Sequence, residues 1–178
     1  MKNIIALGGS NSKNSINKKL ASYAANKVTE TEVTVIDLND FELPLYGVDL
    51  EEASGIPENA TKLNSMIEAS DGIVLSLAEH NGSFTAAFKN AVDWVSRIDP
   101  KLWKNKPMLL LATSPGGRGG ATVLQSAKAL YPHQGANVVA DFSLPSFYDH
   151  FSEEGIKDET LNTVLNKAIS EFQNELHK

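Results

Sequence analysis

The amino-acid sequence predicts a three-layer α/β fold, in which helices cover both faces of one five-stranded parallel sheet. Two observations lead to this expectation. Five short and almost wholly apolar segments recur along the 178 residues, and segments with a helical spacing of apolar residues alternate with them. Strands that are apolar on both sides are typical of parallel sheets buried between two helical layers. No internal repeat or long linker divides the chain, so we expect a single domain over residues 1–178.

The predicted strands are rich in Ile, Val and Leu, which favour extended backbone within a buried sheet. They cover residues 3–7, 33–36, 73–77, 108–112 and 136–140.

Five helices are predicted from apolar residues that recur at three- or four-residue intervals. The first begins at Ile16, the second has Pro57 at its first position, and the fourth is cut short by Pro132. Their stripes are Ile16, Leu20, Tyr23 and Ala24; Ala60, Leu63, Ile67 and Ser70; Phe84, Ala87, Phe88, Ala91, Val92 and Val95; Leu124, Ala127 and Leu130; and Leu161, Val164, Leu165, Ala168, Ile169, Phe172 and Leu176. Residues 38–56 are expected to form a long loop.

The composition excludes several classes of protein. The formal net charge is −6 at pH 7, whereas a nucleic-acid-binding protein presents a basic face. The chain has no cysteine, which excludes disulfides, thiolate nucleophiles and cysteine-bound metals. No apolar run approaches the roughly 20 residues that span a bilayer, and the first strand follows Met1 and Lys2 too closely for a signal peptide. We therefore expect a cytoplasmic protein with no membrane span and no nucleic-acid partner.

Three loops should lie together, because ligands of an open parallel sheet bind at the carboxyl ends of its strands. Residues 8–15, 78–83 and 113–120 follow the first, third and fourth strands and are rich in glycine and small polar residues. The first loop runs directly into a helix, whose free N–H groups and positive dipole end favour an anion. A phosphate is the expected occupant, although the serines of this loop would also serve as a helix cap.

Three motifs in these loops resemble those of the NAD(P)H-dependent FMN reductases, a flavodoxin-like family that includes quinone, azo-dye and chromate reductases. Residues 9–20 resemble the family's phosphate loop, Gly-Ser-x-Arg-x-x-Ser-x-Asn-x-x-Leu. Residues 79–83, with 88–94 after them, resemble its Pro-Glu-Tyr-Asn-Gly-Ser segment and the helix that follows. Residues 114–120 resemble its glycine-rich third loop. The resemblance implies a flavodoxin-like sheet of strand order 2-1-3-4-5 and a bound FMN.

The resemblance also implies which residues would hold FMN, with no catalytic side chain and no metal ligand. The phosphate would be wrapped by Ser10, Ser12, Asn14, Ser15, Ile16 and Asn17. The flavin ring and ribityl chain would lie between Ala78, Glu79, His80, Asn81, Gly82 and Ser83 on one side and Ser114, Pro115, Gly116, Gly117, Arg118 and Gly119 on the other. In the phosphate loop, Ser12 stands where the family has an arginine, and Lys13 lies beside it. In the segment after the third strand, Ala78 and His80 stand where the family has Pro and Tyr.

Several of these residues also have plainer interpretations. His80 could be an exposed loop residue or a general acid, and residues 116–120 could be only a flexible loop. Arg118 could meet a nicotinamide phosphate. The cluster of Phe147, Tyr148, His150 and Phe151 could be a core edge or an aromatic lid over the flavin pocket.

The function implied is hydride and electron transfer from NAD(P)H through bound FMN to a small oxidised acceptor, with ping-pong kinetics. The acceptor would be a quinone, an azo dye, chromate or free flavin. A flavodoxin-like electron carrier and a non-catalytic flavin-binding protein are the alternatives. The family implies a homodimer or homotetramer, for which the apolar helix that carries Trp94 and the Trp103 segment could supply the surface.

Overall fold

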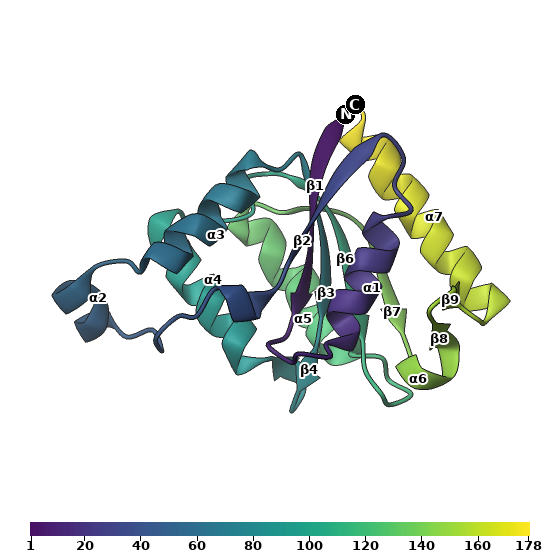
Figure 1. Cartoon of the computed structure of the whole chain (residues 1–178), viewed down its shortest axis with the longest axis horizontal. Helices are drawn as coiled ribbons and strands as arrows, with labels where there is room; N and C mark the ends of the chain where they lie inside the picture. Colours follow the sequence, from purple (N-terminus) through teal and green to yellow (C-terminus); the bar gives the residue numbers. More distant parts are fainter.

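A computed structural model describes all residues, 1–178, and contains the predicted central parallel sheet. Its five strands lie in the order β2-β1-β3-β6-β7, which is the predicted order 2-1-3-4-5 (Figure 1). The strands are β1 (Lys2–Gly9), β2 (Thr31–Ile36), β3 (Gly72–Leu77), β6 (Pro107–Thr113) and β7 (Asn137–Leu144). The last of them extends well beyond its predicted end at residue 140. Two small hairpins are formed by β4 (Glu79–His80) with β5 (Ser83–Phe84) and by β8 (Phe151–Ser152) with β9 (Gly155–Ile156).

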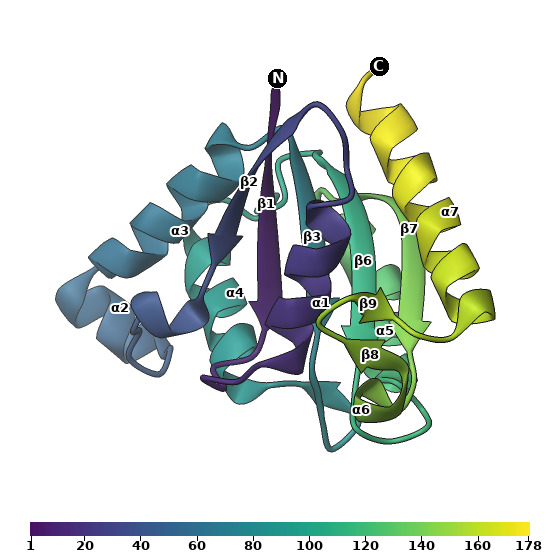
Figure 2. The same ribbon diagram turned by 45° about the vertical axis from the view of Figure 1, so that its right-hand side comes forward.

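Helices cover both faces of this sheet (Figure 2). They are α1 (Ile16–Ala25), α2 (Val48–Ser54), α3 (Glu58–Ala69), α4 (Ala86–Ile98), α5 (Ala121–Leu130), α6 (Phe147–His150) and α7 (Glu159–Leu176), with 3₁₀ turns at η1 (Leu38–Asp40) and η2 (Tyr131–Gln134). The two layers produce two separate apolar cores. One joins the sheet to α3, α4 and α5, and the other joins it to α1 and α7.

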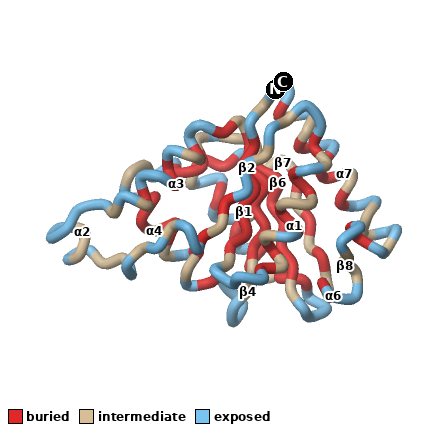
Figure 3. The backbone as a smooth tube through the Cα atoms, viewed as in Figure 1, coloured by how far each residue is buried: buried red, intermediate tan, exposed pale blue.

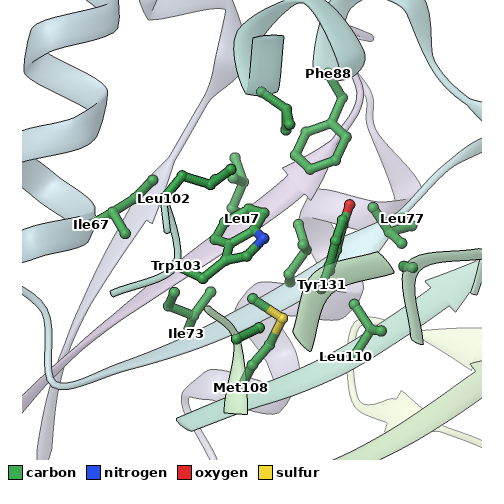
Figure 4. Packing of buried hydrophobic residues seen from close by; sticks show 14 of the residues in the cluster. Leu7, Ile67, Ile73, Leu77, Phe88, Leu102, Trp103, Met108, Leu110 and Tyr131 are labelled. Atoms are coloured by element: carbon green, nitrogen blue, oxygen red, sulfur yellow. The ribbon is translucent and has the colours of Figure 1, made fainter. Parts of the chain in front are cut away.

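The sheet is the most deeply buried part of the molecule (Figure 3). Every residue of β3 is buried, because helices pack on both of its faces and strands flank both of its edges. In the first core, Trp103 and Tyr131 pack with ring centroids 5.1 Å apart, beside Met108 and Leu110 of the sheet (Figure 4).

Three details of the predicted elements are wrong. Phe84 belongs to β5 and not to the following helix, which begins at Ala86 after the Thr85 cap. Pro57 is the cap that precedes α3 rather than its first residue, and Ser70 lies just after the end of that helix. The two hairpins and α6 were not predicted, because segments of two to four residues carry no usable periodicity.

The segment 38–56 is not a plain loop, since it contains η1 and α2. None of the residues of α2 is buried, so no apolar stripe marked it in the sequence. The rest of the segment packs through Leu38, Phe41 and Leu43, and polar contacts also hold it to α4. Trp94 Nε1 donates to the Pro44 carbonyl at 2.7 Å, and Arg97 pairs with Glu51 at 2.9 Å.

The two tryptophan rings are themselves buried, whereas the use of the helix that carries Trp94 and of the Trp103 segment as a contact surface stays a prediction. Trp94 is fully buried and Trp103 is 1% exposed. The exposed large apolar residues of the α2 region are Leu45, Val48 and Ile56. None of the helices is both long enough and apolar enough to cross a membrane.

Candidate functional site

The three predicted loops meet at the carboxyl edge of the sheet and enclose one hollow of about 270 Å³. The edge lies opposite the two chain termini in Figure 1. The hollow is lined by Ser10, Ser12, Asn14, Ser15, Ile16, Asn17, Ala78, Glu79, His80, Thr113, Ser114, Pro115 and Tyr148. The residues predicted for the first loop are therefore all brought together there.

The first loop presents unpaired donors at the start of α1. Ser15 caps the helix, because its Oγ accepts from the Lys18 backbone N–H at 3.1 Å. The backbone N–H groups of Ile16 and Asn17 have no protein acceptor. Residues 10–17 contain no Asp or Glu, and Lys13 is exposed. Free amides at the positive end of a helix, without a competing carboxylate, match a phosphate group.

The side chain of Asn17 joins the first loop to the sheet. The side chain is buried, and its Oδ1 accepts from Ser76 Oγ at 2.7 Å and from the Thr113 N–H at 3.0 Å. Its Nδ2 donates to the Thr113 carbonyl at 3.0 Å. These three bonds, which we call the Asn17 clasp, join the start of α1 to β3 and β6. The backbone N–H of Asn17 takes no part in these bonds and is left to face an anion.

The close approach of α1 to β1 requires a glycine at position 8. A Cβ on Gly8 would lie 2.5 Å from the Lys18 backbone nitrogen and 2.7 Å from its Cα. No side chain could therefore be accommodated without moving the helix away from the sheet. The helix start and the strand end consequently share one small space, which positions the free amides over the sheet edge.

The second loop is a hairpin whose exposed tip extends beyond the hollow. His80, Asn81, Gly82 and Ser83 are all exposed, and Asn81 and Gly82 turn the chain with positive φ angles of 52° and 74°. Asn81, Gly82 and Ser83 do not line the hollow. Glu79 does line it, but its carboxylate accepts from the Val123 N–H of α5 at 2.9 Å. That bond ties the hairpin to the start of α5.

The third loop is tied to the segment that follows β7. Phe147 N–H donates to the Ser114 carbonyl at 3.0 Å, and Ser146 N–H donates to the Gly116 carbonyl at 3.0 Å. Of the residues predicted as contacts in this loop, only Ser114 and Pro115 line the hollow. Gly116 and Gly117 are exposed beside it, and Gly119 is buried against Ser143 and Leu144.

Arg118 also lies outside the hollow, and its guanidinium donates to Thr122 Oγ1 at 2.6 Å. Its side chain is exposed, and it has no carboxylate partner. It therefore remains available to an anion that approaches from solvent.

One ion pair shapes the charge beside the first loop. Lys18 of α1 pairs with Asp37, which follows β2. The hydrogen bond from Lys18 lowers the pKa of the Asp37 carboxyl from its ordinary value of 3.8, and a second bond, from the Asn39 N–H, acts in the same direction. Lys18 is thus neutralised locally, so the anion-binding character of the loop rests on its amides and hydroxyls.

Two residues of the hollow were not predicted as contacts. Thr113 ends β6, and its hydroxyl donates to the Leu144 carbonyl at 2.7 Å. Its place at the carboxyl end of β6, directly before the predicted Ser114, is the sequence signal that could have identified it as a contact. Tyr148 was considered only as part of a core edge or lid. It is 67% exposed and lines the hollow, whereas Phe147 and Phe151 stack behind it with centroids 4.7 Å apart.

Comparisons with known proteins agree with the geometry. The sequence model of the family described as NADPH-dependent FMN reductase matches residues 2–149. A quinone reductase of Escherichia coli (strain K12) is 33% identical over 119 residues, covering 66% of this chain and 63% of that protein. An NADPH azoreductase of Bacillus sp. (strain OY1-2) is 32% identical over 136 residues, which cover 76% of this chain and 72% of that protein. The match therefore spans less than two thirds of the length of the quinone reductase.

A solved structure extends the likeness over the whole chain. The flavoenzyme NAD(P)H:(acceptor) oxidoreductase FerB from Paracoccus denitrificans superposes with a TM-score of 0.76 at 28% identity. The superposition covers 99% of this chain and 98% of that one.

Proposed function

The chain belongs to the NADPH-dependent FMN reductase family, and from that premise we propose that it binds FMN in the hollow and reduces a small acceptor with NAD(P)H. The observation that carries the proposal is the convergence of the three loops around the free amides of Ile16 and Asn17. A phosphate there would receive charge-assisted hydrogen bonds, each worth about 1.5–3 kcal/mol.

The residues present fit FMN. Ser10, Ser12 and Asn14 line the phosphate side of the hollow with small polar side chains. On the proposed ring side, Ala78 and Pro115 supply apolar contact, and the hairpin backbone supplies further donors and acceptors. Bound FMN supplies the hydride and electron transfer itself. The protein's part is to hold the phosphate, fix the orientation of the ring and leave one face open.

The hairpin tip and the glycine-rich loop support an accessible ring. His80 and Gly116 are exposed, so the hollow is open where the ring would lie. One open face would admit the nicotinamide and the acceptor in turn, and we expect ping-pong kinetics for that reason. We place no catalytic side chain there, and His80 is free to act only as a loop residue or as a contact to the acceptor.

The acceptor class we propose is a quinone or an azo dye, because relatives of this chain carry those names. Full-length protein saturated with FMN should oxidise NADPH or NADH when a benzoquinone is added, with no protein partner. Parallel initial-rate lines are the expected pattern. If oxidation occurs only when a redox partner protein is supplied, the electron-carrier alternative holds instead. If flavin binds but neither arrangement oxidises the nicotinamide, the protein is a non-catalytic flavin-binding protein.

We further propose a homodimer or homotetramer whose contact surface lies in the α2 region. Leu45 is 82% exposed, and the exposed residues Val48 and Ile56 lie in the same segment of the chain. Light scattering of the purified protein should give at least twice the 19.3 kDa of one chain. A mass of one chain at micromolar concentration would contradict this part of the proposal.

A further inference from the structure

A second cavity, of about 830 Å³, lies on the outer side of α1. It is bounded by α1, by Val35 of β2 and by the segment containing α6 and β8. Figure 2 shows that this segment lies beside α1. The cavity shares only Tyr148 with the hollow described above, so it is a separate site.

One wall of this cavity is aromatic and rigid. Tyr23 meets Phe151 edge to face with ring centroids 5.3 Å apart, and Phe151 stacks on Phe147. Tyr23 packs directly on Gly155, where any Cβ would clash with the Tyr23 ring and hydroxyl. Tyr148 adds a ring that is 67% exposed. Such a wall offers a ligand with a flat ring a preformed stacking surface.

The cavity also has basic residues: Lys18 and Lys19 of α1, and Lys27, which follows the end of that helix. Lys18 is neutralised by Asp37, but Lys19 and Lys27 have no carboxylate partner. Lys27 Nζ lies 5.0 Å from the Tyr23 ring centroid and 3.2 Å from the Tyr23 hydroxyl. The only carboxylate lining the cavity is that of Glu153. This local excess of positive charge stands out in a chain of net charge −6.

We propose that this cavity binds a planar aromatic anion, such as a nucleoside phosphate. The ring would stack on the wall formed by Tyr23 and Phe151, and the anionic groups would meet Lys19 and Lys27. Such a ligand could be the adenosine phosphate portion of a dinucleotide or an acidic aromatic compound. The two sources share this chemistry, and the test separates them.

The test is a calorimetric titration of full-length, FMN-saturated protein with two probes, adenosine 2′,5′-bisphosphate and naphthalene-1,5-disulfonate. Flavin fluorescence is followed in parallel. The variant Lys19→Glu with Lys27→Glu reverses both free charges. The matched control, Lys62→Glu with Lys167→Glu, makes the same change of net charge at exposed positions of α3 and α7. Tyr23→Leu removes part of the stacking wall.

We expect saturable binding of at least one probe, weakened at least tenfold by the lysine double variant and less than twofold by its control. Tyr23→Leu should also weaken binding. If the Tyr23→Leu protein does not fold, the comparison of the lysine double variant with its control tests the proposal. Binding of the bisphosphate alone identifies a nucleotide site, binding of the disulfonate alone identifies a site for acidic aromatic compounds, and binding of both supports the shared chemistry.

Three results would overturn the proposal. The first is that neither probe binds at millimolar concentration. The second is that the control variant weakens binding as much as the lysine double variant does. The third is that FMN is released as the probe binds, which would place the probe in the hollow. The proposal is independent of the flavin reaction. If the protein binds no FMN, the titration of the lysine variants still reports on this cavity.

Discussion

The loops at residues 10–17 and 78–83 both contribute residues to the hollow, but they are held in different ways. The first segment is anchored by the buried Asn17 clasp and by the tight contact at Gly8. The second is a hairpin with an exposed tip, whose main tie is the bond from Val123 N–H to Glu79. The difference indicates that the proposed phosphate end is preorganised, whereas the proposed ring end is free to vary with the acceptor.

Breaking the clasp should give the largest effect. Asn17→Ala would leave Ser76 Oγ and both backbone groups of Thr113 without a partner in the interior. Each unsatisfied buried group costs about 1–3 kcal/mol, so we expect the free energy of unfolding to fall by about 3–5 kcal/mol. Urea denaturation without flavin measures it.

Asn14→Ala is the matched control, because this asparagine is exposed and its side chain makes no hydrogen bond to the protein. It should change the unfolding free energy by less than about 0.5 kcal/mol. Equal losses in the two variants would mean that the clasp does not anchor the loop.

The tight contact between α1 and β1 should give the next largest effect. Gly8→Ala introduces a Cβ 2.5 Å from backbone atoms, and we expect a loss of about 2–3 kcal/mol from the displaced helix. In Gly116→Ala the nearest atom to the new Cβ would be Ser114 Oγ at 4.0 Å, so its stability should be unchanged. Thermal unfolding of both variants measures this difference in stability. The prediction is contradicted if Gly116→Ala is the less stable of the two.

Removing the helix cap should produce a smaller loss. Ser15→Ala deletes the acceptor for Lys18 N–H and should lower the unfolding free energy by about 1 kcal/mol. The FMN dissociation constant should rise as well, because the amides of α1 would be less well positioned. Ser12→Ala, at an exposed position, should leave stability unchanged. Denaturation and flavin titration of both variants separate the effect on the helix cap from the effect on FMN binding. If Ser12→Ala loses stability and Ser15→Ala does not, Ser15 is not the residue that caps α1.

The Lys18–Asp37 pair should give the smallest effect, since both side chains are about one quarter exposed. Asp37→Asn should cost about 0.5–1 kcal/mol at pH 7. The lowered pKa of Asp37 means that this contribution is complete above about pH 4 and is lost as the pH falls through the folded-state value. Unfolding of wild type and variant at pH 7 and pH 2.5 measures the difference, which should shrink at the lower pH. A difference that grows on acidification would contradict the assignment.

The sequence was sufficient to predict the sheet and the meeting of the three loops, because continuous apolar strands and glycine-rich strand ends are local signals. The strand order was predicted from the resemblance of the loop motifs to a known family. It was not sufficient to predict the Asn17 clasp, whose partners lie 59 and 96 residues away. It also missed α2, which buries no residue, and the burial of both tryptophans, which depends on how the 38–56 segment and η2 cover them.

The central claim is that the start of α1 holds the phosphate of FMN. Equilibrium titration of the purified protein with FMN and with riboflavin, which lacks the phosphate, tests it most directly. Two charge-assisted bonds to the amides of Ile16 and Asn17 predict that FMN binds at least about 100-fold more tightly. Equal dissociation constants for the two flavins, or no binding of FMN, would contradict the account.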